Sequence, residues 1–232
     1  ATIPATNISS SNTALNQPDI LLYTNNERAL QGLRPLKYNA FLANMADAKA
    51  RDMLDKQYFA HVSPSGVDLV MLAERYGYEY LNVGENLALG DFVSSRDVVT
   101  GWMNSPGHRA NILHTSYTEL GVATILGMYN GRPAWFAVQE FGRPMSDCTI
   151  PDPLLKQKIT IYQDQATAFE VTLTNLKTEI DTPGLTRDEY NAKINDYNSI
   201  VASYNNLIAL AKSAVTDFNA QTDVYNLCIV AP

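Results

Sequence analysis

Two histidines and one glutamate occupy positions where their side chains could act together on a metal ion or a ligand. His61 lies in the segment Tyr-Phe-Ala-His-Val-Ser-Pro just after an expected helix, and His108 follows a Pro-Gly break. Glu85 stands between them in a segment whose neighbouring side chains are mostly apolar. Because an unpaired buried charge costs several kcal/mol, this carboxylate requires a cation, a hydrogen-bond network or a metal.

Two imidazoles and one carboxylate suit zinc with an open fourth coordination position. The spacing of His61, Glu85 and His108 does not specify such a site by itself, because local zinc motifs place their ligands within one helix. A hydrogen-bonded polar cluster without metal is therefore an equally good interpretation. His114, the third histidine, is expected to be a packed or surface residue.

Two further polar residues adjoin the histidines. Ser63 lies close to His61, but no acid is placed to orient a serine–histidine pair, and a Ser-Pro turn explains Ser63 better. Arg109 follows His108 directly, where it could hydrogen-bond loop carbonyls or Glu85.

Helices and a β-hairpin are expected to position these residues within one domain over residues 18–148. Helical spacing and capping residues predict helices over residues 19–30, 39–56, 67–76 and 94–105. Two β-branched and aromatic runs, 120–128 and 134–141, flank Asn130-Gly131, which is a strong hairpin signal. Helices that cover an antiparallel hairpin predict a layered α/β (α+β) domain.

The last third of the chain has apolar side chains at alternating steps of four and three residues. This spacing is typical of a coiled-coil seam, and it runs through residues 155–180 and again through 190–225. A Thr-Pro-Gly stop at 182–184 separates the two runs, and Thr186 and Glu189 form a capping box that starts the second helix. The pattern predicts an antiparallel coiled-coil α-hairpin.

The hairpin unit spans residues 149–232; of the two cysteines in the sequence, Cys148 precedes its first helix and Cys228 follows its second. The extended link 149–153 reaches about 16 Å, and the second helix overshoots the first by about 15 Å. Because these lengths agree, we expect the two cysteines to lie at the same height along the hairpin axis and to form a disulfide. The alternative is two separate buried thiols. A disulfide implies an oxidising compartment, so the protein is expected to be exported, either secreted or at the cell surface or in the periplasm.

The composition excludes several classes of function. The chain of 232 residues is 46% hydrophobic and 18% charged, with a formal net charge of −7. These values are typical of a soluble globular protein and argue against binding nucleic acid or anionic membranes by bulk charge. The apolar run at 120–129 is far shorter than the ~20 residues that span a bilayer. Residues 1–17 are expected to form a flexible tail of a mature secreted chain whose signal peptide has been removed.

Four motifs, in this order, resemble the bacterial branch of the SCP-like or CAP superfamily, which includes cysteine-rich secretory proteins, venom antigen 5 proteins and plant pathogenesis-related proteins. They are Tyr-Phe-Ala-His-Val-Ser-Pro at 58–64, Gly-Glu-Asn-Leu at 84–87, Trp-Met-Asn-Ser-Pro-Gly-His-Arg at 102–109 and Gln-Glu-Phe-Gly at 139–142. The resemblance covers residues 20–144 and leaves out the tail and the hairpin. It implies a three-layer α-β-α sandwich with a cleft lined by a His/Glu/Glu/His tetrad, whose two histidines can hold a divalent metal.

His61, Glu85 and His108 match three members of this tetrad, and the resemblance makes the two histidines candidate zinc ligands. The chain departs from the pattern at the fourth member, because Ser105 stands where relatives carry the glutamate of Trp-x-x-Glu. Chemistry that needs two carboxylates is thereby put in question, and the nearby substitutes are Ser63 and Glu119. The expected cleft residues are His61, Ser63, Glu85, Ser105, His108 and Arg109.

Three functions compete at this point. The first is an exported binding module whose cleft holds a metal and a lipid, small-molecule or peptide ligand; the missing second glutamate favours it. The second is a metal-dependent hydrolase acting on peptide or cell-wall material, in which His61 and His108 hold zinc and Glu85 is the general base. The third is a structural role in which the hairpin serves as a spacer, an adhesion arm or an element for self-association.

Overall fold

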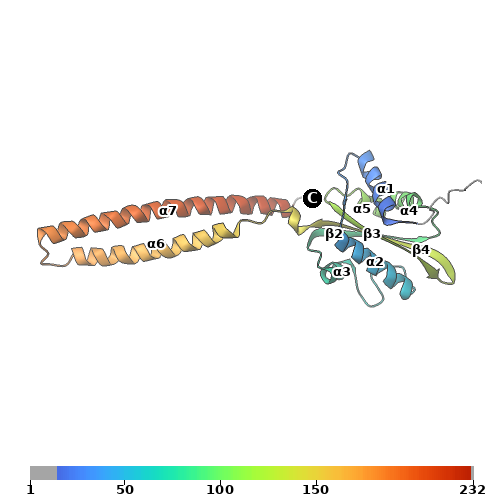
Figure 1. The fold of residues 1–232 in the computed structure, drawn as a ribbon, viewed down its shortest axis with the longest axis horizontal. Helices are drawn as coiled ribbons and strands as arrows, with labels where there is room; N and C mark the ends of the chain where they lie inside the picture. Colours follow the sequence, from blue (N-terminus) through green and yellow to red (C-terminus); the bar gives the residue numbers. More distant parts are fainter. Residues whose placement is uncertain (1–14, 231–232) are drawn as a thin grey trace, which may run out of the picture. The chain divides into compact units, whose positions relative to one another are not determined.

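The computed structural model describes residues 15–230, and these form two compact units divided between Asp147 and Cys148. The first unit holds helices and a sheet, and the second consists of two long helices (Figure 1). Residues 1–14 of the expected tail lie outside the described residues.

A four-stranded sheet forms the middle layer of the first unit. Its strands lie in the spatial order β1 (Lys37–Tyr38), β3 (Glu119–Tyr129), β4 (Arg132–Pro144) and β2 (Tyr80–Gly90). The predicted hairpin is confirmed: β3 and β4 pair antiparallel around Asn130 and Gly131, whose φ angles of 50° and 76° suit a tight hairpin turn. Since β4 also pairs antiparallel with β2, the strand that carries Glu85 lies at the edge of the sheet.

Helices cover both faces of this sheet (Figure 1). One face carries α2 (Ala40–Asp55) and α3 (Leu69–Tyr76), and the other carries α1 (Gln17–Leu30), α4 (Ser95–Met103) and α5 (Pro106–Ile112). On the α2 face, Met53 packs in a core cluster with Phe136, while on the opposite face Trp102 packs with Leu120 and Phe141. The arrangement is the predicted three-layer α-β-α sandwich.

The structure corrects the prediction at the start of the domain. Asn16, not Asp19, is the N-cap of α1, because the side-chain Oδ1 of Asn16 accepts from the N–H of Asp19 at 2.9 Å. Leu15 is buried in the core cluster of the α1 face. Residues 15–17 therefore belong to the folded unit, although the flexible tail was expected to include them.

Two elements next to the candidate site were not predicted. The first is β2, and the second is α5, which begins at Pro106 as the first residue of a new helix. The predicted helix over 94–105 ends earlier, with Asn104 as the C-cap of α4. The Pro-Gly pair at 106–107 therefore starts the helix that carries His108.

The second unit is an antiparallel helical hairpin of α6 (Pro153–Ile180) and α7 (Arg187–Val230). Contacts at two levels join the helices: Lys193 Nζ lies 2.6 Å from Glu179 Oε2, and the hydroxyl of Tyr204 donates to Glu170 Oε1 at 2.8 Å. The predicted capping box is also present, since the N–H of Thr186 donates to the Glu189 carboxylate at 2.8 Å. The coiled-coil seam stays a prediction from the sequence.

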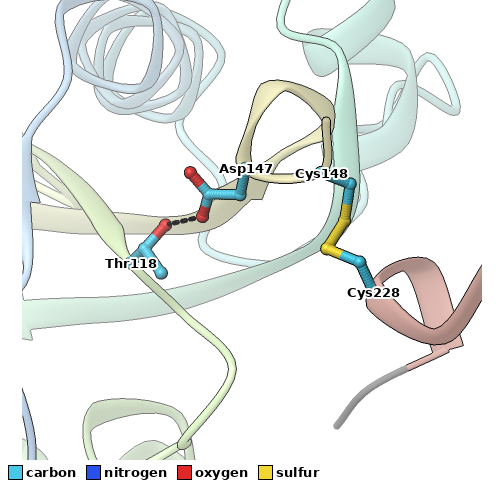
Figure 2. The surroundings of a disulfide bond; sticks show 4 residues. All are labelled: Thr118, Asp147, Cys148 and Cys228. Carbon is cyan, nitrogen blue, oxygen red and sulfur yellow. Dashed lines mark hydrogen bonds between the residues drawn. A yellow bond between two sulfur atoms is a disulfide. The ribbon is translucent and has the colours of Figure 1, made fainter. Parts of the chain in front are cut away.

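Cys148 and Cys228 form the predicted disulfide, which links the residue directly after Asp147 to the end of α7 (Figure 2). Their Cα atoms are 5.7 Å apart, and 80 positions separate them in the sequence. In the chain-entropy model, closing a loop of about 80 residues stabilises the folded state by up to about 4.5 kcal/mol. Asp147, just before the disulfide, accepts a hydrogen bond from the Thr118 hydroxyl at 2.8 Å.

Candidate functional site

The candidate site lies at the free edge of β2, where segments from both faces of the sheet meet. The loop after α2 carries His61 to this edge from one face, and α5 carries His108 from the other. The α5 helix is fixed to the strand by two side-chain amides: Asn86 Nδ2 donates to the His108 carbonyl at 3.1 Å, and Asn111 Nδ2 donates to the Glu85 carbonyl at 3.0 Å.

His61 and Glu85 are in direct contact. His61 Nδ1 lies 2.6 Å from Glu85 Oε1, and the Glu85 side chain is only 4% exposed, whereas that of His61 is 63% exposed. A carboxylate can only accept a hydrogen bond, so Nδ1 carries the proton and Nε2 is left without one in the neutral ring. The hydrogen bond to Glu85 raises the pKa of His61, because it stabilises the protonated ring.

His108 lies close enough to His61 for their charges to interact. Burial lowers the pKa of His108, and the charge of His61 lowers it further, so the ring of His108 is neutral near neutral pH. Arg28, a buried residue of α1, holds the far end of α5 by donating to the carbonyl of Ile112 at 2.8 Å. The fold thus puts His61 in contact with Glu85 and places His108 near His61.

Glu140 on β4 is a site residue that the sequence did not reveal. The β2–β4 pairing places Glu140 directly opposite Glu85, so the two side chains project from the same face of the sheet. Glu140 is 0% exposed. The available signals were the Gln-Glu-Phe-Gly motif at 139–142 and an acidic residue in a predicted strand, but its partner could not be identified because β2 itself was not predicted.

A buried lysine of α2, Lys49, contacts the loop that carries His61. Lys49 is 2% exposed, and its Nζ donates to the backbone carbonyl of His61 at 2.6 Å. It also lies 5.4 Å from the centre of the Tyr58 ring. Lys49 therefore fixes the loop that presents His61.

Among the described residues, none of the other candidates has a hydrogen bond to Glu85. Ser63 Oγ accepts from the N–H of Val67 at 2.9 Å, as expected for a turn. The Glu119 carboxylate lies on β3 and accepts from Tyr78 and Asn39, each at 2.9 Å. Ser105 stands before α5 without a side-chain capping bond. Arg109 is exposed, and its guanidinium has no hydrogen bond within residues 15–230.

A hollow of about 240 Å³ opens beside His61 and Glu85. Its other lining residues are the aliphatic Val62, Leu69 and Val70, together with Asp68. The Val62 and Val70 side chains remain 52% and 45% exposed. An aliphatic wall next to an imidazole and a carboxylate suits a small apolar group that carries a polar head.

The protonation of the two imidazoles is compatible with binding a divalent metal. Metal-binding histidines commonly donate their second ring nitrogen to a carboxylate, as His61 does to Glu85, and metal binding requires a neutral ring such as that of His108. Within residues 15–230, no group of three or more His, Cys, Asp or Glu is arranged to hold a metal. Water or ligand atoms would therefore complete the coordination of a metal held by His61 and His108, and the metal would act as a Lewis acid.

Known proteins are similar to the first unit. Residues 21–141 match the family model described as CAP, the cysteine-rich secretory protein family. The uncharacterized protein YkwD of Bacillus subtilis is 43% identical over 102 residues, which are 44% of this chain and 39% of that protein. The uncharacterized membrane protein YlbC of the same organism is 36% identical over 107 residues, which are 46% of this chain and 31% of that protein.

Two solved structures also resemble part of the chain. An extracellular protein containing an SCP domain from Bacillus anthracis is 31% identical, with a TM-score of 0.48, over 55% of this chain and 40% of that one. An outer surface protein from Borrelia burgdorferi is 20% identical, with a TM-score of 0.48, over 55% of this chain and 91% of that one. Because the family model covers more than half of its residues, the chain belongs to the cysteine-rich secretory protein (CAP) family.

Proposed function

We propose that this chain is an exported binding protein whose cleft at the edge of β2 takes a small ligand with an aliphatic part. The aliphatic hollow beside His61 and Glu85 carries this proposal. A volume of about 240 Å³ suits a short alkyl segment or one aliphatic side chain, so the ligand is a lipid, a small molecule or a peptide that inserts only its apolar part. His61 and His108 hold a divalent metal, with zinc as the expected ion.

The position of Glu85 favours binding over hydrolysis. A general base must come within hydrogen-bond reach of the proton that it removes. One oxygen of Glu85 already accepts from His61, and the other is buried. Glu85 therefore orients His61, whereas a metal-dependent hydrolase would require it to act on a substrate or a water.

The disulfide supports an extracytoplasmic location. Cys148 and Cys228 are joined, and disulfides persist mainly in oxidising compartments. None of the helices described between residues 15 and 230 combines the length and hydrophobicity required to cross a membrane.

The surface of the hairpin favours self-association as a second function. Among the residues of α6 and α7, only Leu207 and Ala214 are buried. Large apolar side chains stay exposed on both helices, with Ile161 at 44% and Leu210 at 55%. Two helices alone do not enclose a core, and a second hairpin would bury these residues in a four-helix arrangement.

Ligand binding is tested with octanoate as a lipid-like probe and N-acetyl-leucine amide as a peptide-like probe. We expect the methyl NMR signals of Val62, Leu69 and Val70 to shift on addition of one of these probes. Val70→Asp should weaken binding by about tenfold, because it places a charge beside the bound alkyl group. The matched control Val93→Asp changes a valine that is 70% exposed and does not line the hollow, and should have no effect. Absence of binding by both probes, or equal binding by both variants, contradicts the proposal.

Metal binding is tested by calorimetry with zinc on chelator-treated protein. Because Glu85 raises the pKa of His61, protons compete with the metal, and affinity should fall as the pH is lowered from about 7.5 to about 5.5. His61→Ala and His108→Ala should each abolish binding, whereas His114→Ala, which changes the remaining histidine, should not. Heat of binding that survives in both cleft variants rules out the two-histidine site.

Self-association is tested by light scattering over a range of concentrations. The wild-type mass should rise toward that of a dimer as concentration increases. Ile161→Glu and Leu210→Glu should keep the chain monomeric, because they place charges on the apolar surface that a second hairpin would cover. Glu74→Gln, a surface change on α3, should behave as wild type. A wild-type chain that stays monomeric at every concentration contradicts this function.

A further inference from the structure

Three carboxylate oxygens behind His61 have no hydrogen-bond donor within the described part of the chain. They are Oε2 of Glu85 and both oxygens of Glu140, and all three are buried from water. Glu140 lies opposite Glu85 across β2 and β4, and the two carboxyl groups are close enough to interact directly. If both were ionised, each would be an acceptor facing another acceptor, with no proton to join them.

The groups that face Glu140 do not neutralise it by an ion pair. Glu85 on β2 faces Glu140, and the charge of Lys49 on α2 interacts with it. The residue paired with Glu140 on β3 is Gly121, which has no side chain. The charge of Lys49 lowers the pKa of Glu140, but Lys49 Nζ donates to the His61 carbonyl. Among residues 15–230, Lys49 forms no ion pair with a carboxylate.

The packing of α2 on the sheet keeps water away from Glu140. A Cβ on Gly121 would collide with the α2 backbone at Leu42 and Ala43, so the helix lies directly against the sheet beside Glu140. An ionised carboxylate in such a position loses its hydration without gaining a partner. A proton on the carboxyl group removes the charge and provides the missing donor.

We propose that Glu140 is a protonated carboxylic acid at neutral pH that donates to Oε2 of Glu85, so that β2 and β4 present a carboxyl–carboxylate pair behind His61. Glu85 is the acceptor in this pair, because its Oε1 already accepts from His61 Nδ1. The second carboxyl group of the site thus comes from β4, although the family pattern would place it at Ser105. Glu140 acts through Glu85 and is a positioning residue: it holds Glu85 in the orientation that meets His61.

The pH dependence of stability follows from the same pair. Burial is the main cause that raises the pKa of Glu140 well above its ordinary value, and the charge of Glu85 is the next. The folded chain therefore keeps a proton that the unfolded chain releases near pH ~4.3. The stabilisation is complete below that pH and is lost as the pH rises through the folded-state pKa. Across this window the unfolding equilibrium constant should increase by about tenfold per pH unit.

The test compares wild type with Glu140→Gln, which mimics the neutral acid, and with Glu140→Ala, which removes the donor. In chelator-treated wild type at neutral pH, infrared spectra should show a protonated carboxylic C=O band that shifts in heavy water. This band should be lost in Glu140→Gln, and the fall in stability with rising pH should become smaller there, because the raised pKa of His61 still contributes to it. At neutral pH, Glu140→Gln should be as stable as wild type or more so, whereas Glu140→Ala should be less stable. Glu74→Gln should keep both the band and the pH dependence.

Carbon-13 NMR of glutamate-labelled wild type provides a measurement that needs no variant. One glutamate carboxyl carbon should remain in its protonated form at neutral pH. Spectra in which every glutamate is ionised there would overturn the proposal, as would a carboxylic band that persists in Glu140→Gln or a pH dependence of stability that this variant leaves unchanged. These readouts do not depend on whether the cleft binds a ligand or a metal.

Discussion

The register between β2 and β4 is the constraint on which the candidate site depends. It puts Glu85 opposite Glu140 on the face covered by α2, at an edge where the loop after α2 brings His61 within hydrogen-bond distance. Side chains alternate along a strand, so a shift of one residue would turn Glu85 toward the α1 face. The carboxylate would then lose His61, and the polar neighbour Asn86 would enter the apolar layer beneath α2.

The neighbouring residues Glu85 and Asn86 of β2 make hydrogen bonds on opposite faces of the sheet. Glu85 meets His61 on one face, while Asn86 on the other face donates to Gln139 Oε1 at 3.1 Å and also to the His108 carbonyl. Asn111 on α5 donates two hydrogen bonds to β2, one to the Glu85 carbonyl and one to Asn86 Oδ1. One edge strand thereby holds both histidine-bearing segments, which explains why residues so distant in sequence share a site.

The sequence predicted the parts of the fold that depend on local patterns. Helix caps such as Asn39, the Asn130-Gly131 turn and the capping box at Thr186 each act within a few residues. The disulfide was predictable because it needed only the lengths of two helices. By contrast, β2 contains asparagine, glycine and glutamate, which have low strand propensity, and it is a strand because it pairs with β4. Glu140 became a site residue only through this non-local pairing.

Glu85 connects all parts of the site, because it is the residue that orients His61 and the one that Glu140 supports. Nitrogen-15 NMR of the His61 ring in chelator-treated protein, at a pH above the pKa of the ring, examines this role directly. A hydrogen bond from Nδ1 to a carboxylate requires the proton of the neutral ring to lie on Nδ1, and Glu85→Ala should move it to Nε2. A wild-type ring that carries its proton on Nε2 would contradict the site described here.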